Sequence, residues 1–296
     1  MTDAPILEVR NVSRSYRKGG FFGGTHFRAV NDVSFTLPAK PQVFSIVGES
    51  GSGKTTLARM VLRLVEPSEG DIRLLGRPLT GREGRIDNLE FRRLVQPIFQ
   101  NPFEAFSAYL PIEDYLRRTA LNLKVARTAE EADKLADRAL RSVNLSLDRI
   151  RGKYIRQFSG GELQRISVAR ALIPQPKLIV ADEPVSMVDA SLRMSIVNLF
   201  RTIVEEQGVS FIYITHDLST AYYLSDQVAI MNHGRVVESG VPTDILDNPS
   251  EAYTRELMAA IPTVGERWSE LDAIDRAYPT HSSRQKTGSN QPPANA

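Results

Sequence analysis

The sequence predicts an α/β protein with a mostly parallel, helix-covered sheet, and two observations predict this fold class. Short apolar runs rich in β-branched residues have the length of strands buried on both faces, at residues 43–47, 178–181, 211–215 and 228–231. Helical patterns fall between them, at residues 54–65, 161–172, 191–206 and 217–224. Such alternation is typical of parallel sheets whose strands are joined by crossover helices.

Other segments extend this core. Residues 6–9, 33–37 and 71–75 interleave apolar and polar side chains, which predicts an antiparallel β subdomain with one solvated face. The glycine-rich stretch 18–24 predicts a long loop. A charge-rich helical pattern at 110–148 predicts an inserted helical subdomain over about 102–172. We expect one domain over 1–262 and a C-terminal extension over 263–296, whose polar end suits a disordered tail.

The composition excludes several classes of protein. With 37 Lys and Arg against 35 Asp and Glu, the net charge of +2 argues against a nucleic-acid-binding protein. No apolar run reaches the roughly 18 residues of a spanning helix, and the N-terminus lacks the pattern of a secretory signal, so we expect a cytosolic chain. The absence of cysteine excludes disulfides, thiolate zinc sites and cysteine-held iron–sulfur clusters.

A phosphate-binding loop lies between the first buried strand and the helix that follows it. The segment GESGSGKT matches G-x-x-x-x-G-K-[ST] in the strand-to-helix context that the motif requires. Its glycines allow backbone N–H groups to face a phosphate, and the helix N-terminus adds a favourable dipole. Lys54 then reaches the β and γ phosphates, and Thr55 ligates Mg²⁺. The candidate ATP-binding residues here are Gly48, Glu49, Ser50, Gly51, Ser52, Gly53, Lys54, Thr55 and Thr56.

Two acids end the apolar run KLIVADE. Carboxylates at the C-terminal end of a parallel strand lie in the crevice where ligands of α/β sheets bind. Asp182 is therefore a candidate Mg²⁺ ligand beside Thr55. Glu183 is the candidate residue that orients or deprotonates the attacking water. Together with the phosphate loop, this pair favours nucleotide hydrolysis over simple binding.

The segment FSGGELQR supplies a second Ser/Gly loop at the start of a helix, through Ser159, Gly160 and Gly161. With the two motifs above, it makes the chain resemble the ATP-binding subunits of ABC transporters over about residues 5–262, with a P-loop ATPase core. The signature motif of that family is S-G-G-x-x-x-R. The resemblance implies that two subunits pack head to tail, each signature loop capping the nucleotide on the other's phosphate loop.

The same resemblance assigns four further residues. Gln100, in PIFQNP, matches a glutamine that contacts Mg²⁺ and the attacking water. Asp189, in SMVDAS, matches a loop that crosses the dimer interface, and His216, in YITHD, matches a histidine that contacts the γ-phosphate. Tyr16 is placed like the aromatic residue that stacks on adenine. The competing aromatics are Phe21, Phe22 and Phe27.

Within the family, the chain resembles the oligopeptide/dipeptide group of importers, and its segment ESGSGKTTLAR resembles that of the F-type subunit. This implies MgATP as cofactor, a second, different ATP-binding subunit, two transmembrane permease subunits and an extracytoplasmic solute-binding protein. It also implies a peripheral location on the cytoplasmic face of the inner membrane. Many members hold an iron–sulfur cluster on C-terminal cysteines, and none is expected here.

Alternatives stay open at this stage. The wording GELQRISVARAL resembles members associated with oligosaccharide uptake, and the sequence does not decide between peptide and sugar. Other interpretations are an ATP-binding subunit of an exporter or of another importer group, a soluble ABC ATPase acting on ribosomes or DNA, and a non-hydrolysing binding module. The last is disfavoured because Glu183 and His216 are both present.

Overall fold

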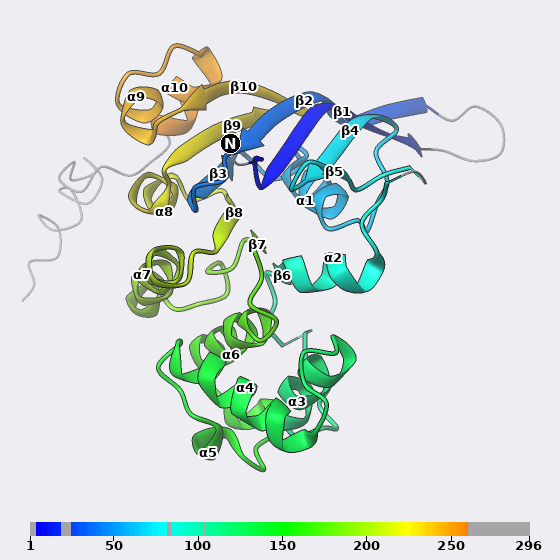
Figure 1. Ribbon diagram of the computed structural model, residues 1–296. Helices are drawn as coiled ribbons and strands as arrows, with labels where there is room; N and C mark the ends of the chain where they lie inside the picture. Colours follow the sequence, from blue (N-terminus) through cyan, green and yellow to red (C-terminus); the bar gives the residue numbers. More distant parts are fainter. Residues whose placement is uncertain (1–3, 19–24, 82–83, 104, 260–296) are drawn as a thin grey trace, which may run out of the picture. The chain divides into compact units, whose positions relative to one another are not determined.

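The computed structural model describes residues 4–18, 25–81, 84–103 and 105–259 (Figure 1). Most of the predicted glycine-rich loop, with Phe21 and Phe22, and the whole C-terminal extension over 263–296 lie outside the described residues. Within the part of the chain that is described, no helix has the length and apolar character needed to cross a membrane.

The larger sheet has the strand order β10-β9-β3-β8-β7-β6. All neighbouring pairs are parallel except β9 and β10, which form an antiparallel hairpin at one edge. Its strands are β3 (Val43–Val47), β6 (Val95–Ile98), β7 (Leu178–Asp182), β8 (Ser210–Thr215), β9 (Gln227–Asn232) and β10 (Arg235–Gly240). The predicted, mostly parallel sheet is therefore confirmed.

The smaller sheet is antiparallel, in the order β2-β1-β4-β5. It consists of β1 (Leu7–Lys18), β2 (Thr25–Leu37), β4 (Glu69–Leu74) and β5 (Arg77–Pro78). β1 and β2 are much longer than the sequence predicts, because the register shifts near Asn11 and Asp32 interrupt the alternation of side chains. Both residues have positive φ angles, 48° and 57°, and the Asn11 amide donates to the Asp32 carboxylate at 2.9 Å.

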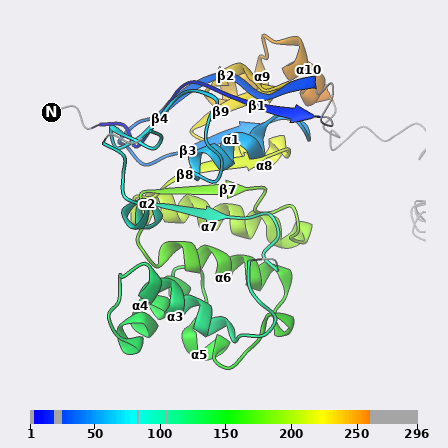
Figure 2. The same ribbon diagram turned by 90° about the vertical axis from the view of Figure 1, so that its right-hand side faces the viewer.

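Helices cover the parallel sheet, as Figures 1 and 2 show. α1 (Lys54–Val61) lies beside the antiparallel sheet, whereas α3 to α6 gather in a separate helical layer together with a short 3₁₀ turn at Ile155–Gln157. That layer is the predicted helical subdomain. The remaining helices are α2 (Asn88–Leu94), α3 (Ile112–Asn122), α4 (Ala129–Arg141), α5 (Leu147–Ile150), α6 (Gly160–Leu172), α7 (Ala190–Gln207), α8 (Leu218–Leu224), α9 (Pro242–Asp247) and α10 (Ala252–Ala259).

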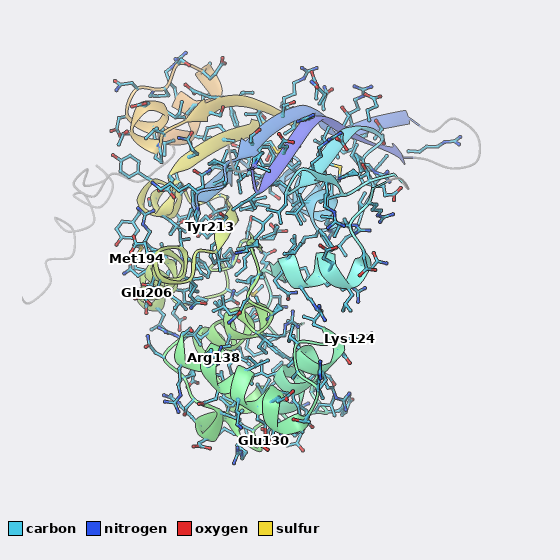
Figure 3. All side chains as sticks on the ribbon, viewed as in Figure 1. Lys124, Glu130, Arg138, Met194, Glu206 and Tyr213 are labelled. Atoms are coloured by element: carbon cyan, nitrogen blue, oxygen red, sulfur yellow. The ribbon has the colours of Figure 1, made fainter. Side chains whose placement is uncertain are left out.

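Two apolar cores lie on opposite faces of the parallel sheet. Along β7, Ile179 and Ala181 pack into the core shared with the helical layer, whereas Leu178 and Val180 pack toward α1 and the antiparallel sheet. This is the two-residue period of a strand buried on both faces. Tyr213 of β8 lies inside the first core (Figure 3), where its hydroxyl lies 3.2 Å from that of Thr220 and burial raises its pKa to about 12.

The sequence analysis missed β6, the outermost parallel strand. Its segment VQPI contains Pro97, which cannot donate a backbone hydrogen bond and so weakens the strand pattern. β6 is an edge strand that pairs only with β7, so one side of it needs no donor. Gln100 lies two residues beyond the end of this strand.

Candidate nucleotide-binding and hydrolysis site

The phosphate loop connects β3 to α1 and lies directly against neighbouring backbone. A Cβ atom at Gly53 would lie 2.2 Å from the Ala29 carbonyl oxygen, and one at Gly48 would lie 2.1 Å from that of Met231. Gly53 also has φ of 107°, a region that other residues rarely adopt. These two glycines therefore allow the loop to pack on β2 and β9.

Lys54 lies buried under the loop. Its ammonium donates to the carbonyl oxygens of Gly48 and Glu49, both at 2.7 Å. Burial is the main cause that lowers the pKa of Lys54, while Glu183, Asp182 and Glu49 act to raise it. The arrangement supplies a cation beneath a loop at a helix N-terminus, which is the chemistry of a phosphate site.

Thr55 and Asp182 meet at the C-terminal end of β7. The Thr55 hydroxyl donates to the Asp182 carboxylate at 3.4 Å. Burial raises the pKa of Asp182, and the charge of Glu183 adds to this, against the hydrogen bond from Thr55. A hydroxyl and a partly buried carboxylate are hard oxygen donors suited to Mg²⁺, and a divalent cation would offset the cost of the charge.

Three side chains from adjacent strands converge beside this pair. The Gln100 amide donates to one oxygen of the Glu183 carboxylate at 3.3 Å, and His216 Nδ1 lies 3.1 Å from the other. Gln100 follows β6, Glu183 follows β7 and His216 follows β8. Because neighbouring parallel strands end at the same edge of the sheet, residues far apart in the sequence meet here.

Glu183 itself is held in an uncommon conformation. Its φ angle is 46°, and its backbone N–H donates to the Ile214 carbonyl at 2.9 Å. Its own carbonyl accepts from the Ser186 hydroxyl at 2.9 Å. A left-handed φ at a non-glycine residue persists only where the surroundings fix it, so the backbone from which this carboxylate extends is well determined.

The signature loop lies in the helical layer. Ser159 and Glu162 form a reciprocal capping box at the start of α6: the Ser159 hydroxyl accepts from the Glu162 N–H at 3.2 Å, and the Glu162 carboxylate accepts from the Ser159 N–H at 3.1 Å. A Cβ atom at Gly161 would lie 3.1 Å from Leu192 of α7. Figures 1 and 2 both place α6 in the helical layer and α1 beside the antiparallel sheet. The two helices thus start in different layers of the molecule.

Two predicted site residues, Asp189 and Tyr16, lie away from the Glu183 cluster. Asp189 is exposed at the N-cap of α7, where its carbonyl accepts from the Leu192 and Arg193 N–H groups. Tyr16 is exposed on β1 directly opposite Phe27, and the Arg14 guanidinium lies 4.8 Å from the centre of its ring. Both aromatics are candidates for stacking on a base.

The structure adds residues that sequence reasoning missed. Arg59 and Arg170 line the same hollow as Thr55, Gln100 and Asp182. Arg193 and Asp217 line a small pocket with Glu183 and His216, and the Arg193 guanidinium donates to Asp217 at 3.4 Å. Although Arg59, Arg170 and Asp217 lie within segments quoted above, the sequence assigns none of these residues a role. The folded arrangement of α1, α6, α7 and the start of α8 brings them to the site.

The fold and this site define an α/β nucleotide-binding ATPase, and comparison with known proteins specifies which. The family model described as ABC transporter matches residues 30–186. The oligopeptide transport ATP-binding protein OppF of Streptococcus mutans is 35% identical over 87% of this chain and 82% of its own length. The corresponding protein of Bacillus subtilis is 37% identical over the same shares.

A solved structure agrees. A dimeric ATP-binding cassette, bound to ADP and Pi in a post-hydrolysis state, superposes with a TM-score of 0.68 and 25% identity over 80% of this chain and 98% of that one. The chain belongs to the ABC transporter family of ATP-binding proteins. The predicted family, fold class and ATPase activity are thereby confirmed.

Proposed function

We propose that this chain is the ATP-hydrolysing subunit that powers an importer of oligopeptides or dipeptides. The observation that carries the hydrolytic part is the Glu183 carboxylate, held between Gln100 and His216 at the sheet edge next to Thr55 and Asp182. The names of the relatives, which are oligopeptide transport ATP-binding proteins, support the solute class.

In this proposal the phosphate loop and Lys54 bind the nucleotide phosphates, and Thr55, Asp182 and Gln100 hold Mg²⁺. The cation neutralises charge that develops on the phosphates when it is bound. Glu183 accepts a proton from the attacking water, and its carboxylate is positioned for this between the Gln100 amide and His216 Nδ1. His216 contacts the γ-phosphate, and Gln100 orients the water.

We propose that the site is completed by a second ATP-binding subunit, in a heterodimer. Ser159 caps α6, and Gly160 and Gly161 begin it, in a different layer from α1, which supports a role in capping a nucleotide on another chain. The dimeric state of the solved cassette supports this arrangement. Asp189, exposed at the start of α7, then lies at the interface between the subunits.

The permease subunits would dock in a groove between α1, α2, β6 and α3. Its wall combines apolar residues such as Leu64, Phe91 and Phe99 with a group of arginines: Arg63, Arg85, Arg92 and Arg170. Among the described residues that line it, none is acidic. Basic and apolar lining fits an amphipathic permease helix that carries a carboxylate.

The remaining parts of the proposal concern location and cofactors. The chain would lie peripherally on the cytoplasmic face of the inner membrane, held by permease subunits that receive solute from an extracytoplasmic binding protein. It would bind ATP and Mg²⁺. It would bind no nucleic acid, since its net charge is only +2, and no cysteine-held iron–sulfur cluster, since it has no cysteine. Oligosaccharide transport by the same machinery is the alternative, because the solute does not contact this chain.

Reconstitution tests the proposal. The chain would be co-expressed with candidate permeases, a second ATP-binding subunit and a solute-binding protein from the same organism, and the complex placed in vesicles. We expect ATP hydrolysis to rise when peptide-loaded binding protein is added. A rise with an oligosaccharide instead would replace the solute class, and a chain that does not assemble with permeases would refute the transport role.

A further inference from the structure

A tyrosine on α10, the last helix of the described chain, contacts the phosphate loop. The Glu49 N–H donates to the Tyr253 hydroxyl at 3.1 Å, although 204 residues separate them. Tyr253 lies on α10 and is half-buried, whereas Glu49 is the second residue of the loop. None of the motifs that define the site includes Tyr253.

Both backbone polar groups of Glu49, at the start of the loop, are hydrogen-bonded. The Glu49 N–H donates to Tyr253, and the Glu49 carbonyl accepts from Lys54 at 2.7 Å. A nucleotide phosphate would compete with the loop carbonyls for the three N–H donors of Lys54. The bond to Tyr253 does not depend on Lys54 and is free to persist.

α10 is anchored to the ATPase core independently of the loop. The buried Glu238 carboxylate of β10 accepts from the Ser250 N–H at 2.9 Å, the Ser250 hydroxyl at 2.7 Å and the Glu251 N–H at 3.4 Å. Arg255 donates to the carbonyls of Pro249 and Ser250. These bonds fix the first turn of α10, which carries Tyr253.

We propose that Tyr253 is a positioning residue for ATP binding, which holds the start of the phosphate loop in its binding conformation through the Glu49 N–H. This inference rests on the nucleotide site proposed above. Within the described part of the chain, the hydroxyl bonds to the backbone of the loop, and the proposal gives it no part in the reaction. Its loss therefore weakens ATP binding and leaves the chemical step unchanged.

The test compares two tyrosine variants of the full chain. Tyr253→Phe removes the acceptor, and Tyr222→Phe is the matched control, since the Tyr222 hydroxyl bonds to Asp247 at 3.2 Å away from the loop. Binding of a fluorescent ATP analogue gives Kd, and phosphate release gives KM and kcat. We expect the Kd and KM of Tyr253→Phe to rise about two- to tenfold, as for the loss of one neutral hydrogen bond, with kcat and melting temperature unchanged.

A second variant separates positioning from general damage. Glu238→Gln loosens the anchor of α10, so it should raise Kd in the same direction, and the double variant should bind no more weakly than Tyr253→Phe alone. Equal Kd values for Tyr253→Phe and Tyr222→Phe would overturn the inference. So would a fall in the kcat or the melting temperature of Tyr253→Phe that matches the rise in its Kd. A wild-type chain that bound no ATP would overturn the proposed nucleotide site as well.

Discussion

Replacing Glu183 with glutamine tests the assignment of the catalytic base. The glutamine side chain has the shape of the carboxylate that it replaces. It keeps an oxygen that can accept from the Gln100 amide, which lies 3.3 Å from Glu183 in the wild type. It has no basic oxygen and no charge. The charge of Glu183 raises the pKa of its neighbour Asp182, so its removal should favour the ionised, metal-binding form of Asp182.

The two effects predict opposite changes in binding and turnover. A positioned general base contributes about 10²- to 10⁴-fold to a rate, so kcat of Glu183→Gln should fall by that factor, or about 2.7 to 5.4 kcal/mol in barrier height. ATP affinity in the presence of Mg²⁺ should be equal or higher. Nucleotides would then accumulate on the variant without being hydrolysed.

Phosphate release at saturating MgATP measures the first effect, and equilibrium binding of a fluorescent ATP analogue measures the second. Glu206→Gln is the matched control, since Glu206 is exposed on α7 and lies outside the site (Figure 3). A variant that turned over within tenfold of the wild type would refute the role of Glu183 as base. Loss of ATP binding would show instead that the carboxylate supports the site structurally.

Three further predictions concern stability and pH. Burial raises the pKa of Asp182. Between its ordinary and its raised pKa the folded state therefore holds more protons than the unfolded state, and the free energy of unfolding falls as pH rises. The Asp182→Asn variant should lose ATP hydrolysis but should not melt at a lower temperature than the wild type at neutral pH. Gly53→Ala should lower the unfolding free energy more than Gly51→Ala, by roughly 1–3 kcal/mol, because both have positive φ but only Gly53 meets the Ala29 carbonyl; equal losses in denaturant titrations would refute this. Burial acts to raise the pKa of Glu238, but hydrogen bonds lower it, and the net pKa is lowered. The resulting stabilisation is present above the pKa of Glu238 in the unfolded state and is lost as pH falls through its pKa in the folded state. The difference in melting temperature between wild type and Glu238→Gln should therefore vanish in acid, and a difference that stayed constant with pH would contradict this prediction.

Much of the fold could be predicted because burial on both faces leaves a simple pattern. β3, β7 and β8 are nearly continuous apolar runs, which few other structures require. β6 could not be predicted, since an edge strand with a proline carries no such pattern. The length of β1 was also hidden, because its bulges shift the alternation that identifies a half-buried strand.

The site divides in the same way. The phosphate loop and the acid pair could be predicted because each is contiguous and its residues act as a unit. Gln100 and His216 were assigned from a resemblance, and only the strand order β8-β7-β6 explains why they reach Glu183. Tyr253 left no signal, since a single tyrosine on a short helix has no pattern that points to a loop 204 residues away.

The strand order also gives a route by which the groove proposed to receive a permease subunit would influence hydrolysis. β6 is the edge strand, with Gln96 and Pro97 lining that groove and Gln100 at its C-terminal end contacting Glu183. A strand that pairs on only one side can shift more easily than one held on both sides. A displacement of β6 would therefore change the distance between Gln100 and Glu183 while β7 and β8, paired on both sides, kept Glu183 and His216 together. The edge position that hid this strand from sequence analysis is the property that suits it to carry a signal to Glu183, the proposed catalytic base.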